Sequence, residues 1–428
     1  MKRIRLSEGI FLNIIESDKF KTDYFDFNII LPLREKTASH AALLPLVLKR
    51  GCKKYPAMAD ISKRLDYLYS TGFSTRITKR GEAHIIGFTA DFLRESLIPA
   101  GEHLMDDVFD TIRNIIFNPL IADGAFNNEY VESEKNNLID AIKSLINNKN
   151  AYAMKKCHEI ACAGSHFAVG ENGKVEIVEN ITATELYDFY KKLLAGCTIE
   201  MFYTGMCDEK VIINHAQNLV SGIERGKLFD ISTEKYERTR NEVSETCEEM
   251  EVAQGKLAMC FASGHTVNEE KYTAYSVFNC IYGASPTSKL FENVREKLSL
   301  CYYCRSLPDS HKGILTVVSG IEVENRDKAV KEILAQLDNA KNGDISDEEI
   351  QNAKKTLTNS YRELFDSAPD LSMWYLSRLI GGSEKTIEEI ISEIDKVTKD
   401  DLIACAQSTE LDTIFFLKGT LESGGEEE

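Results

Sequence analysis

The stretch from Ser288 to Tyr303 contains two side chains that could together bind a peptide carbonyl. It reads Ser-Lys-Leu-Phe-Glu-Asn-Val-Arg-Glu-Lys-Leu-Ser-Leu-Cys-Tyr-Tyr. A serine cap followed by apolar residues on one face predicts a helix that ends near Arg295. The residues from Leu300 onward predict the next strand, so Arg295 and Tyr302 could converge across the turn. A guanidinium and a phenol are both hydrogen-bond donors, which would bind a carbonyl oxygen and stabilise the anion formed during attack on a peptide bond.

Both side chains also have an ordinary structural interpretation. Arg295 would then be a solvated helix residue, and Tyr302 would be an aromatic residue of the core. The residues alone leave this alternative open.

Two further groups of reactive side chains indicate structure rather than chemistry. Two cysteines and two histidines lie between Cys157 and His166, but no second cluster of matching spacing accompanies them, so we interpret the segment as a helix with a buried thiol. Cys301 and Cys304 form a Cys-x-x-Cys pair inside a predicted strand. Because strand side chains alternate between faces, the two thiols are predicted to point in opposite directions and not to act as a redox pair.

The elements that must position these residues occur twice along the chain. The segment from Thr182 to Gly205 is a threonine-capped helix followed by a β-rich strand that ends at glycine, and the segment from Thr398 to Gly419 repeats it. Glu185 and Asp401 follow the two threonines at the spacing of a capping box or its close variant. The two segments agree in the order of their elements and in the residues that begin and end them, which predicts an internal duplication.

Two earlier segments match in the same way. Residues 27–33 and 257–263 read as buried strands, and each leads into a helix. Gly51 and Gly283 are predicted to end these helices where the chain turns left-handed. Strand-rich and helix-rich segments alternate unevenly, which predicts an α+β unit with helices packed on one sheet, made twice.

The connection between the two halves is predicted in a polar, weakly periodic segment between Gly205 and about Asn241. We therefore expect an N-terminal domain over residues 1–225 and a C-terminal domain over residues 226–428.

Composition limits the partners and the compartment. The chain has 428 residues and a formal net charge of −17, which disfavours nucleic acid and anionic membranes as partners and mildly favours basic peptides. No stretch approaches the roughly 18 apolar residues that a membrane span needs. The eleven cysteines are an odd number and are widely spread, which is typical of reduced thiols in the cytoplasm.

The segment around Arg295 resembles the substrate-binding segment of the insulinase-like zinc peptidases, of the pitrilysin and mitochondrial processing peptidase type. In that family an Arg-Glu-Lys-x-x-Leu-Ala-Tyr segment supplies an arginine and a tyrosine that bind substrate. The resemblance covers nearly the whole chain and implies two duplicated α+β domains, each with a mainly antiparallel sheet. It also implies that Arg295 and Tyr302 bind substrate. The motif maps, with cysteine in place of the usual alanine, onto Arg295, Glu296, Lys297, Leu300, Cys301 and Tyr302.

The zinc motif of that family is degenerate in this chain. Active members carry His-x-x-Glu-His on one helix, where the histidines bind the metal and the glutamate is the general base. Aligned from Gly51, the motif places Ala42 and Leu46 at the histidines and Pro45 at the glutamate. Glu132 matches the family's third metal ligand, but without the two histidines we interpret it as part of a solvated acidic helix face. The resemblance therefore implies no catalytic residue, no metal and no cofactor in this chain.

Together these features predict a non-catalytic subunit of a heterodimeric insulinase-like peptidase. A paralogous subunit with an intact His-x-x-Glu-His motif would supply the zinc and the general base, and the bound ligand would be a peptide. The likeness is greatest to the paired bacterial insulinase-like proteins associated with the aminopentanol modification of elongation factor P.

Two other functions remain open at this point. The chain could be a structural core protein in which Arg295 and Tyr302 are relics, or a self-sufficient peptide-binding scaffold. Homodimerisation of the isolated chain is also left open.

Overall fold

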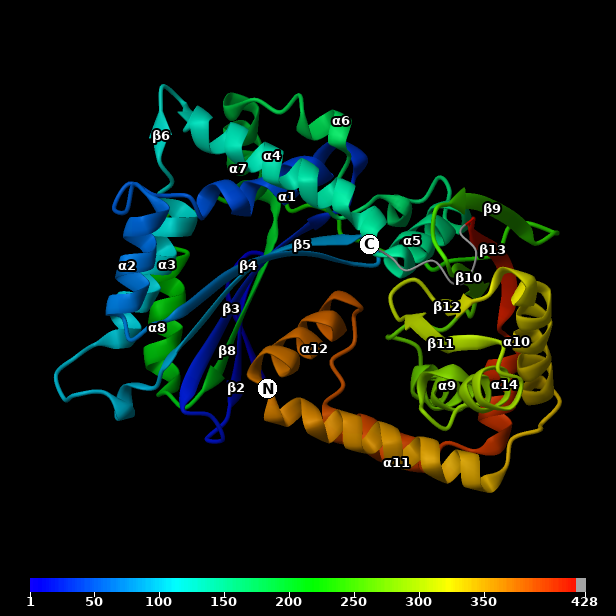
Figure 1. Cartoon of the computed structure of the whole chain (residues 1–428). Helices are drawn as coiled ribbons and strands as arrows, with labels where there is room; N and C mark the ends of the chain where they lie inside the picture. The colour runs from blue at the N-terminus through cyan, green and yellow to red at the C-terminus, as the bar shows by residue number, and fades with distance from the viewer. Residues whose placement is uncertain (421–428) are drawn as a thin grey trace. The chain divides into compact units, whose positions relative to one another are not determined.

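The computed structural model describes residues 1–420 as two compact units, each built around one sheet (Figure 1). The first unit comprises Met1–Lys143, Val169–Ser232 and Asp366–Ser377. The second comprises Ser144–Ala168, Thr233–Phe365 and, of the described residues, 378–420. Both units combine a sheet with packed helices, which confirms the predicted α+β class. Residues 421–428 of the predicted C-terminal domain lie outside the described residues.

The first sheet has six strands in the order β1-β2-β8-β3-β5-β4. Its neighbouring strands run antiparallel except for β2 and β8, which are parallel. The strands are β1 (Lys2–Ser7), β2 (Ile10–Glu16), β3 (Thr22–Pro32), β4 (Gly72–Arg80), β5 (Ala83–Leu93) and β8 (Thr198–Gly205). A separate small sheet pairs β6 (Ile121–Ala122) with β7 (Ala125–Phe126).

Strand alternation gives the first sheet one apolar face. Phe25, Phe27 and Ile29 of β3 point to the same side and are buried with apolar residues of the surrounding helices. This core removes the helices' apolar stripes from water, which is the main stabilising term of such a layered unit. The helices of this unit are α1 (Glu35–Leu48), α2 (Met58–Tyr67), α3 (Leu104–Phe117), α4 (Asn128–Ser144), α6 (Val175–Val178), α7 (Ala183–Gly196) and α8 (Glu209–Leu219).

The opposite face of the first sheet is polar and carries a helix from late in the chain. The carboxylate of Asp26 on β3 is fully buried and accepts hydrogen bonds from Nη2 of Arg76 on β4, at 2.8 and 2.9 Å. It also accepts a 2.9 Å hydrogen bond from the Ser372 hydroxyl. Ser372 lies on α12 (Ala368–Ile380), of which the part up to Ser377 belongs to this unit.

The second sheet has five strands in the order β11-β12-β10-β13-β9. They run antiparallel except for β13 and β9, which are parallel. The strands are β9 (Ser244–Met250), β10 (Gly255–Ala262), β11 (Cys301–Asp309), β12 (Ile314–Ile321) and β13 (Glu410–Gly419). The helices are α5 (Lys149–Ala161), α9 (Tyr272–Asn279), the π-helical segments Cys280–Ala284 and Leu290–Lys297, α10 (Arg326–Lys341), α11 (Asp347–Glu363), α13 (Ile387–Lys396) and α14 (Lys399–Gln407).

Helix α5 packs on the second sheet although it comes from the first half of the sequence. Its buried residues Ala153 and Cys157 share an apolar cluster with Ala258 of β10 and Phe415 of β13. The Cys157 thiol donates to the backbone carbonyl of Ala258 at 3.5 Å. Helices α5 and α12 thus each complete a compact unit made largely from the other half of the chain, an exchange that the sequence pattern did not indicate.

The predicted helix caps are confirmed. The Thr182 hydroxyl accepts a hydrogen bond from the Glu185 backbone N–H at 3.2 Å, and the Thr398 hydroxyl accepts one from the Asp401 backbone N–H at 3.3 Å. In both cases the acidic side chain bonds back to the threonine N–H, which completes a capping box.

The predicted role of two glycines is wrong. Neither Gly51 nor Gly283 adopts a left-handed backbone. A Cβ atom on Gly51 would lie 2.1 Å from the Pro56 carbonyl oxygen, and one on Gly283 would lie 2.6 Å from the Ser306 hydroxyl. Glycine is required at both positions because other atoms approach closely.

None of the helices within residues 1–420 combines the length and apolar character of a membrane span.

Candidate functional site

Arg295 and Tyr302 lie on either side of a tight turn in the second unit. Arg295 is near the end of the π-helical segment Leu290–Lys297, and Tyr302 is the second residue of β11. Between them Ser299 adopts φ +49°, the left-handed region that non-glycine residues rarely occupy. The Leu300 backbone N–H donates back to the Val294 carbonyl at 3.1 Å. This bond closes the turn and brings the start of β11 next to the end of the helix.

The Arg295 side chain is held along its own helical segment. Its guanidinium carbon lies 4.5 Å from the centre of the Phe291 ring, a cation–π geometry. Its Nε atom lies 3.5 Å from Oε1 of Glu296. The side chain is 39% exposed, so donor groups remain accessible to a ligand.

Tyr302 is 60% exposed, so the interpretation of this residue as a core aromatic is wrong. Its hydroxyl donates a 3.0 Å hydrogen bond to Oε1 of Glu322, just after β12. Within residues 1–420 Arg295 and Tyr302 do not contact each other through a hydrogen bond or ring. Their convergence on one carbonyl oxygen stays a prediction.

The prediction that Cys301 and Cys304 point to opposite faces is also wrong. Cys301 pairs with Ile321 of β12, and Cys304 pairs with Ser319, but the intervening register shifts by one residue. Ile321 and Ser319 are two residues apart and share a face, so their partners share it too. Tyr302 is the extra residue of this β-bulge. A bulge reverses the usual alternation of side chains between the two faces of a strand, and no local pattern in the sequence predicted it.

The zinc-motif positions contain apolar side chains inside α1. Ala42 is 1% exposed within the first core, and Leu46 packs against that core. Pro45 lies in the same helix. These three side chains offer no nitrogen, oxygen or sulfur atom to a metal, and none can act as a base.

Two acidic residues of α4, Glu132 and Glu134, are paired with cations. The carboxylate of Glu132, the predicted third-ligand position, accepts a 2.9 Å hydrogen bond from Nζ of Lys135. The neighbouring Glu134 is buried and bonds to Nη1 of Arg50 at 3.3 Å. Nδ2 of Asn137 also donates to Glu134 at 3.0 Å. Over residues 1–420 the structure shows no group of three or more His, Cys, Asp or Glu side chains that could hold a metal ion.

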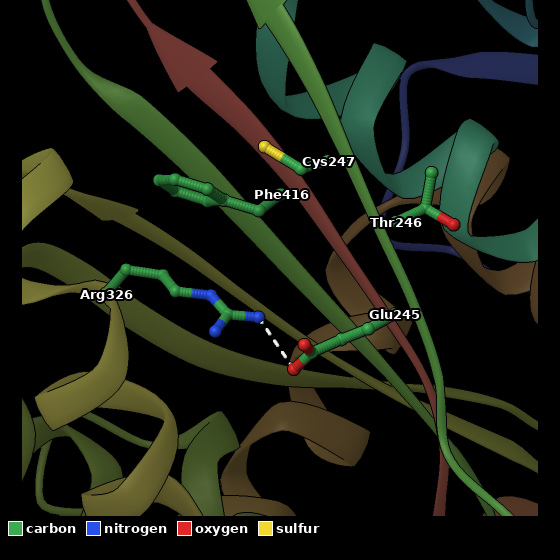
Figure 2. A pocket seen from close by; sticks show the side chains of 5 residues that line it. All are labelled: Glu245, Thr246, Cys247, Arg326 and Phe416. Carbon is green, nitrogen blue, oxygen red and sulfur yellow. Dashed lines mark hydrogen bonds and ion pairs between the residues drawn. The ribbon is translucent and has the colours of Figure 1, made fainter.

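A pocket of about 300 Å³ lies at the β9 edge of the second sheet, and sequence reasoning did not find it. Figure 2 shows Arg326 pointing across it to Glu245, with a distance of 2.7 Å between Nη2 and Oε1. The guanidinium also bonds to Asp327 at 2.7 Å. Because two carboxylates balance this arginine, the pocket does not favour an anionic ligand. It lies at β9, whereas Tyr302 lies on β11 at the other edge of the sheet. The pocket is lined by Glu245, Thr246, Cys247, Arg326 and Phe416.

Comparison with known proteins identifies the family. Residues 180–357 match the family model described as the peptidase M16 inactive domain. The chain is 33% identical over 412 residues to the probable inactive metalloprotease YmfF of Bacillus subtilis, covering 96% of each protein. The chain is an inactive member of the insulinase-like peptidase M16 family. The degenerate positions in α1 agree with this membership, because M16 hydrolysis requires the side chains that are missing there.

Two further similar proteins are a curated zinc protease and a solved structure. The chain is 28% identical over 188 residues to an uncharacterized zinc protease of Bacillus subtilis, YmxG, which covers 42% of each protein. A crystal structure of a conserved protein from Enterococcus faecalis V583 superposes with a TM-score of 0.90, at 29% identity and 99% coverage of both chains. A crystal structure of a peptidase M16 inactive domain from Pseudomonas fluorescens superposes with a TM-score of 0.81 over 99% of both chains, at 15% identity, so the M16 fold extends over nearly the whole chain.

Proposed function

We propose that this chain is the non-catalytic, substrate-binding subunit of a heterodimeric M16 zinc peptidase. Arg295 and Tyr302 would donate hydrogen bonds to a peptide carbonyl, while a paralogous subunit would supply the zinc and the general base. One observation carries the proposal: two accessible donors flank a tightly closed turn in a chain whose zinc-motif positions are apolar. Such a chain can hold a substrate and cannot activate water.

The surroundings of the two donors support a binding role. Tyr302 donates its proton to Glu322 in the free chain, and this exposed bond can be exchanged for a bond to a carbonyl oxygen at little net cost. The Phe291 ring keeps the Arg295 guanidinium extended along the helix, which lowers the entropy lost when a ligand binds. Donors held in this way could stabilise negative charge as it develops on the carbonyl oxygen.

The expected partners follow from charge and family. A net charge of −17 favours basic peptides over nucleic acid and anionic membranes. Eleven free cysteines, all within the described residues, suit a reducing compartment, and we propose the cytoplasm. The YmxG and YmfF similarities, found in one organism, support a pairing of a zinc-binding and an inactive paralogue. The link to elongation factor P modification stays a prediction.

The test is reconstitution with the paralogue from the same organism that retains His-x-x-Glu-His. The isolated chain should bind no stoichiometric zinc and should show no peptidase activity. In the mixture, Arg295→Ala should lower kcat/KM by ~10²-fold or more, the scale of losing one donor to an oxyanion. Lys297→Ala is the matched control, because it removes a cation from the same segment whose Nζ donates, within residues 1–420, only to Oδ1 of Asn293.

A second pair of variants isolates the phenol. Tyr302→Phe should lower the peptidase activity of the mixture. Tyr303→Phe, at the next residue, which pairs with Gly320 of β12, should not. Unchanged rates for both Arg295→Ala and Tyr302→Phe would refute the substrate-binding role.

One observation favours a second candidate, a structural core or scaffold protein. Both side chains already have partners within the chain, as a purely structural role without a ligand would require. Arg295 contacts Phe291 and Glu296, and Tyr302 donates to Glu322. Co-purification from the native host, with zinc measured in the complex, separates the two candidates. A stable complex that contains no zinc-binding paralogue would support the scaffold.

A further inference from the structure

We propose that Cys301 and Cys304 form a redox-active dithiol that closes to a disulfide at the turn carrying Arg295 and Tyr302. The effect of this closure on substrate binding rests on the function proposed above. The dithiol chemistry itself does not, because it depends only on residues of this chain.

The strand register brings the two thiols to one face of the sheet. Ile321 and Ser319 lie two residues apart on β12, and they are the cross-strand partners of Cys301 and Cys304. Cross-strand partners in an antiparallel ladder point to the same side. The bulge residue Tyr302 takes up the extra position, so both thiols face the side on which Ile321 and Ser319 lie. The two thiols are also within hydrogen-bonding reach of each other, and a disulfide requires such neighbouring sulfur atoms.

The environment differentiates the two thiols in the way that a redox pair needs. A hydrogen bond from the Cys304 side chain lowers the pKa of Cys301, and Ser319 and the Arg295 charge act in the same direction against the effect of burial. The same pairing, together with burial, raises the pKa of Cys304. Cys301 is half-buried and can be reached by a small reagent, whereas Cys304 is 4% exposed. Cys301 is therefore the attacking thiol, and Cys304 the resolving one.

The other cysteines do not combine these features. Cys157 and Cys260 are close to each other, but both are fully buried. Cys207 is accessible in part, but burial and nearby carboxylates raise its pKa to about 11. Cys247 is exposed on the edge strand β9, far along the sheet from β11. It serves as an internal control for a thiol without a partner cysteine.

The reaction is thiol–disulfide exchange with a low-molecular-weight disulfide such as oxidised glutathione. The Cys301 thiolate attacks one sulfur of that disulfide, its S–S bond breaks, and one glutathione thiolate leaves. The Cys304 thiol then loses its proton and attacks the Cys301 sulfur, which releases the second glutathione. Two electrons and two protons pass from the dithiol to the small disulfide, so the step balances.

Closure would act on the peptide-binding turn. The new bond would tie together the two ends of the bulge that presents Tyr302. It would also remove the Cys301 thiol, whose ionised form the Arg295 charge stabilises, and this leaves the guanidinium freer to attract a carbonyl oxygen. The cysteine pair would therefore couple the redox state of the cell to the affinity of this turn for a peptide substrate.

Mass spectrometry of the full chain tests the disulfide directly. The protein is equilibrated in glutathione buffers of rising oxidised fraction, alkylated and digested with trypsin. Cleavage after Lys297 and Arg305 yields residues 298–305, which carry both cysteines, and residues 241–256 carry only Cys247. We expect the first peptide to carry no alkyl group and no glutathione, and to weigh two hydrogen atoms less than the unmodified dithiol peptide. Residues 241–256 should instead gain glutathione, and a dithiol reductant should reverse both changes.

Two variants make the result decisive. In Cys304→Ser the reaction should stop with glutathione attached to Cys301, because the resolving thiol is missing. The same variant should slow alkylation of Cys301 at neutral pH by on the order of three- to tenfold, while Cys247 in the same sample keeps its rate. The proposal is overturned if residues 298–305 stay fully alkylated when Cys247 is oxidised, or if Cys304→Ser leaves the rate at Cys301 unchanged.

These readouts separate this inference from the proposed function, because they require neither the paralogue nor a substrate. A disulfide that forms while Arg295→Ala has no effect on the reconstituted peptidase would preserve the dithiol and refute the substrate-binding role. The reverse pattern would preserve the substrate-binding role and refute the dithiol.

Discussion

His84 should make the first unit sensitive to acid. It lies on β5 opposite Leu31 of β3, and its side chain is fully buried. Burial lowers the pKa of His84 from 6.5 to about 4, an effect that Glu171 opposes. The imidazole is therefore neutral in the folded chain over a pH range in which the unfolded chain binds a proton.

The sign and size of the effect follow from this difference. Above pH 6.5 neither state is protonated at His84, so the full stability is present. As the pH falls from 6.5 towards 4, only the unfolded state gains a proton, and the free energy of unfolding decreases. From pH 7 to pH 5 this covers about 1.5 pH units at about 1.4 kcal/mol each, so His84 should remove about 2 kcal/mol of stability.

The assay uses the single tryptophan of the chain. Trp374 lies on the part of α12 that belongs to the first unit, so its fluorescence reports the unfolding of that unit. Denaturant unfolding at pH 7 and at pH 5 is compared between the natural chain and His84→Leu, which places an apolar side chain that cannot be protonated opposite Leu31. The natural chain should lose about 2 kcal/mol more than the variant between the two pH values.

His103→Gln is the matched control, since His103 is exposed just before α3 and should not alter the pH dependence. If the natural chain and His84→Leu lose the same stability between pH 7 and pH 5, the buried neutral imidazole is refuted as the cause.

Two further substitutions test the packing of each unit. Arg76→Met should lower the free energy of unfolding by about 3–5 kcal/mol, because it leaves the fully buried Asp26 carboxylate without its cation. Unfolding is followed by Trp374 fluorescence, and a change below about 1 kcal/mol would show that the pair contributes as little as an exposed one. Thr398→Ala should lower the free energy of unfolding of the second unit by about 1 kcal/mol, because the α14 helix loses its cap. Calorimetry measures the thermal unfolding transition, and an unchanged transition would show that the cap is dispensable.

Much of the architecture was predictable because its signals are local. The capping boxes at Thr182 and Thr398 depend on side chains three residues apart, so the sequence alone indicated both helix starts. Apolar runs in β3 and β10 predicted buried strands for the same reason. The loss of the metal-binding side chains at Ala42 and its neighbours needed no structure at all, because the residue types themselves exclude coordination.

Only the tertiary structure decided the features that depend on distant segments. The exchange of α5 and α12 between the two units depends on which sheet face each helix covers, and neither helix carries that information in its own pattern. Likewise the bulge at Tyr302 arises from the register between β11 and β12. Alternation along one strand predicts opposite faces for Cys301 and Cys304, but the register with the partner strand places them on the same face. Periodicity is a property of one segment, whereas register and face are properties of a pair, so the sequence determined the elements and their folded pairing determined which side chains meet.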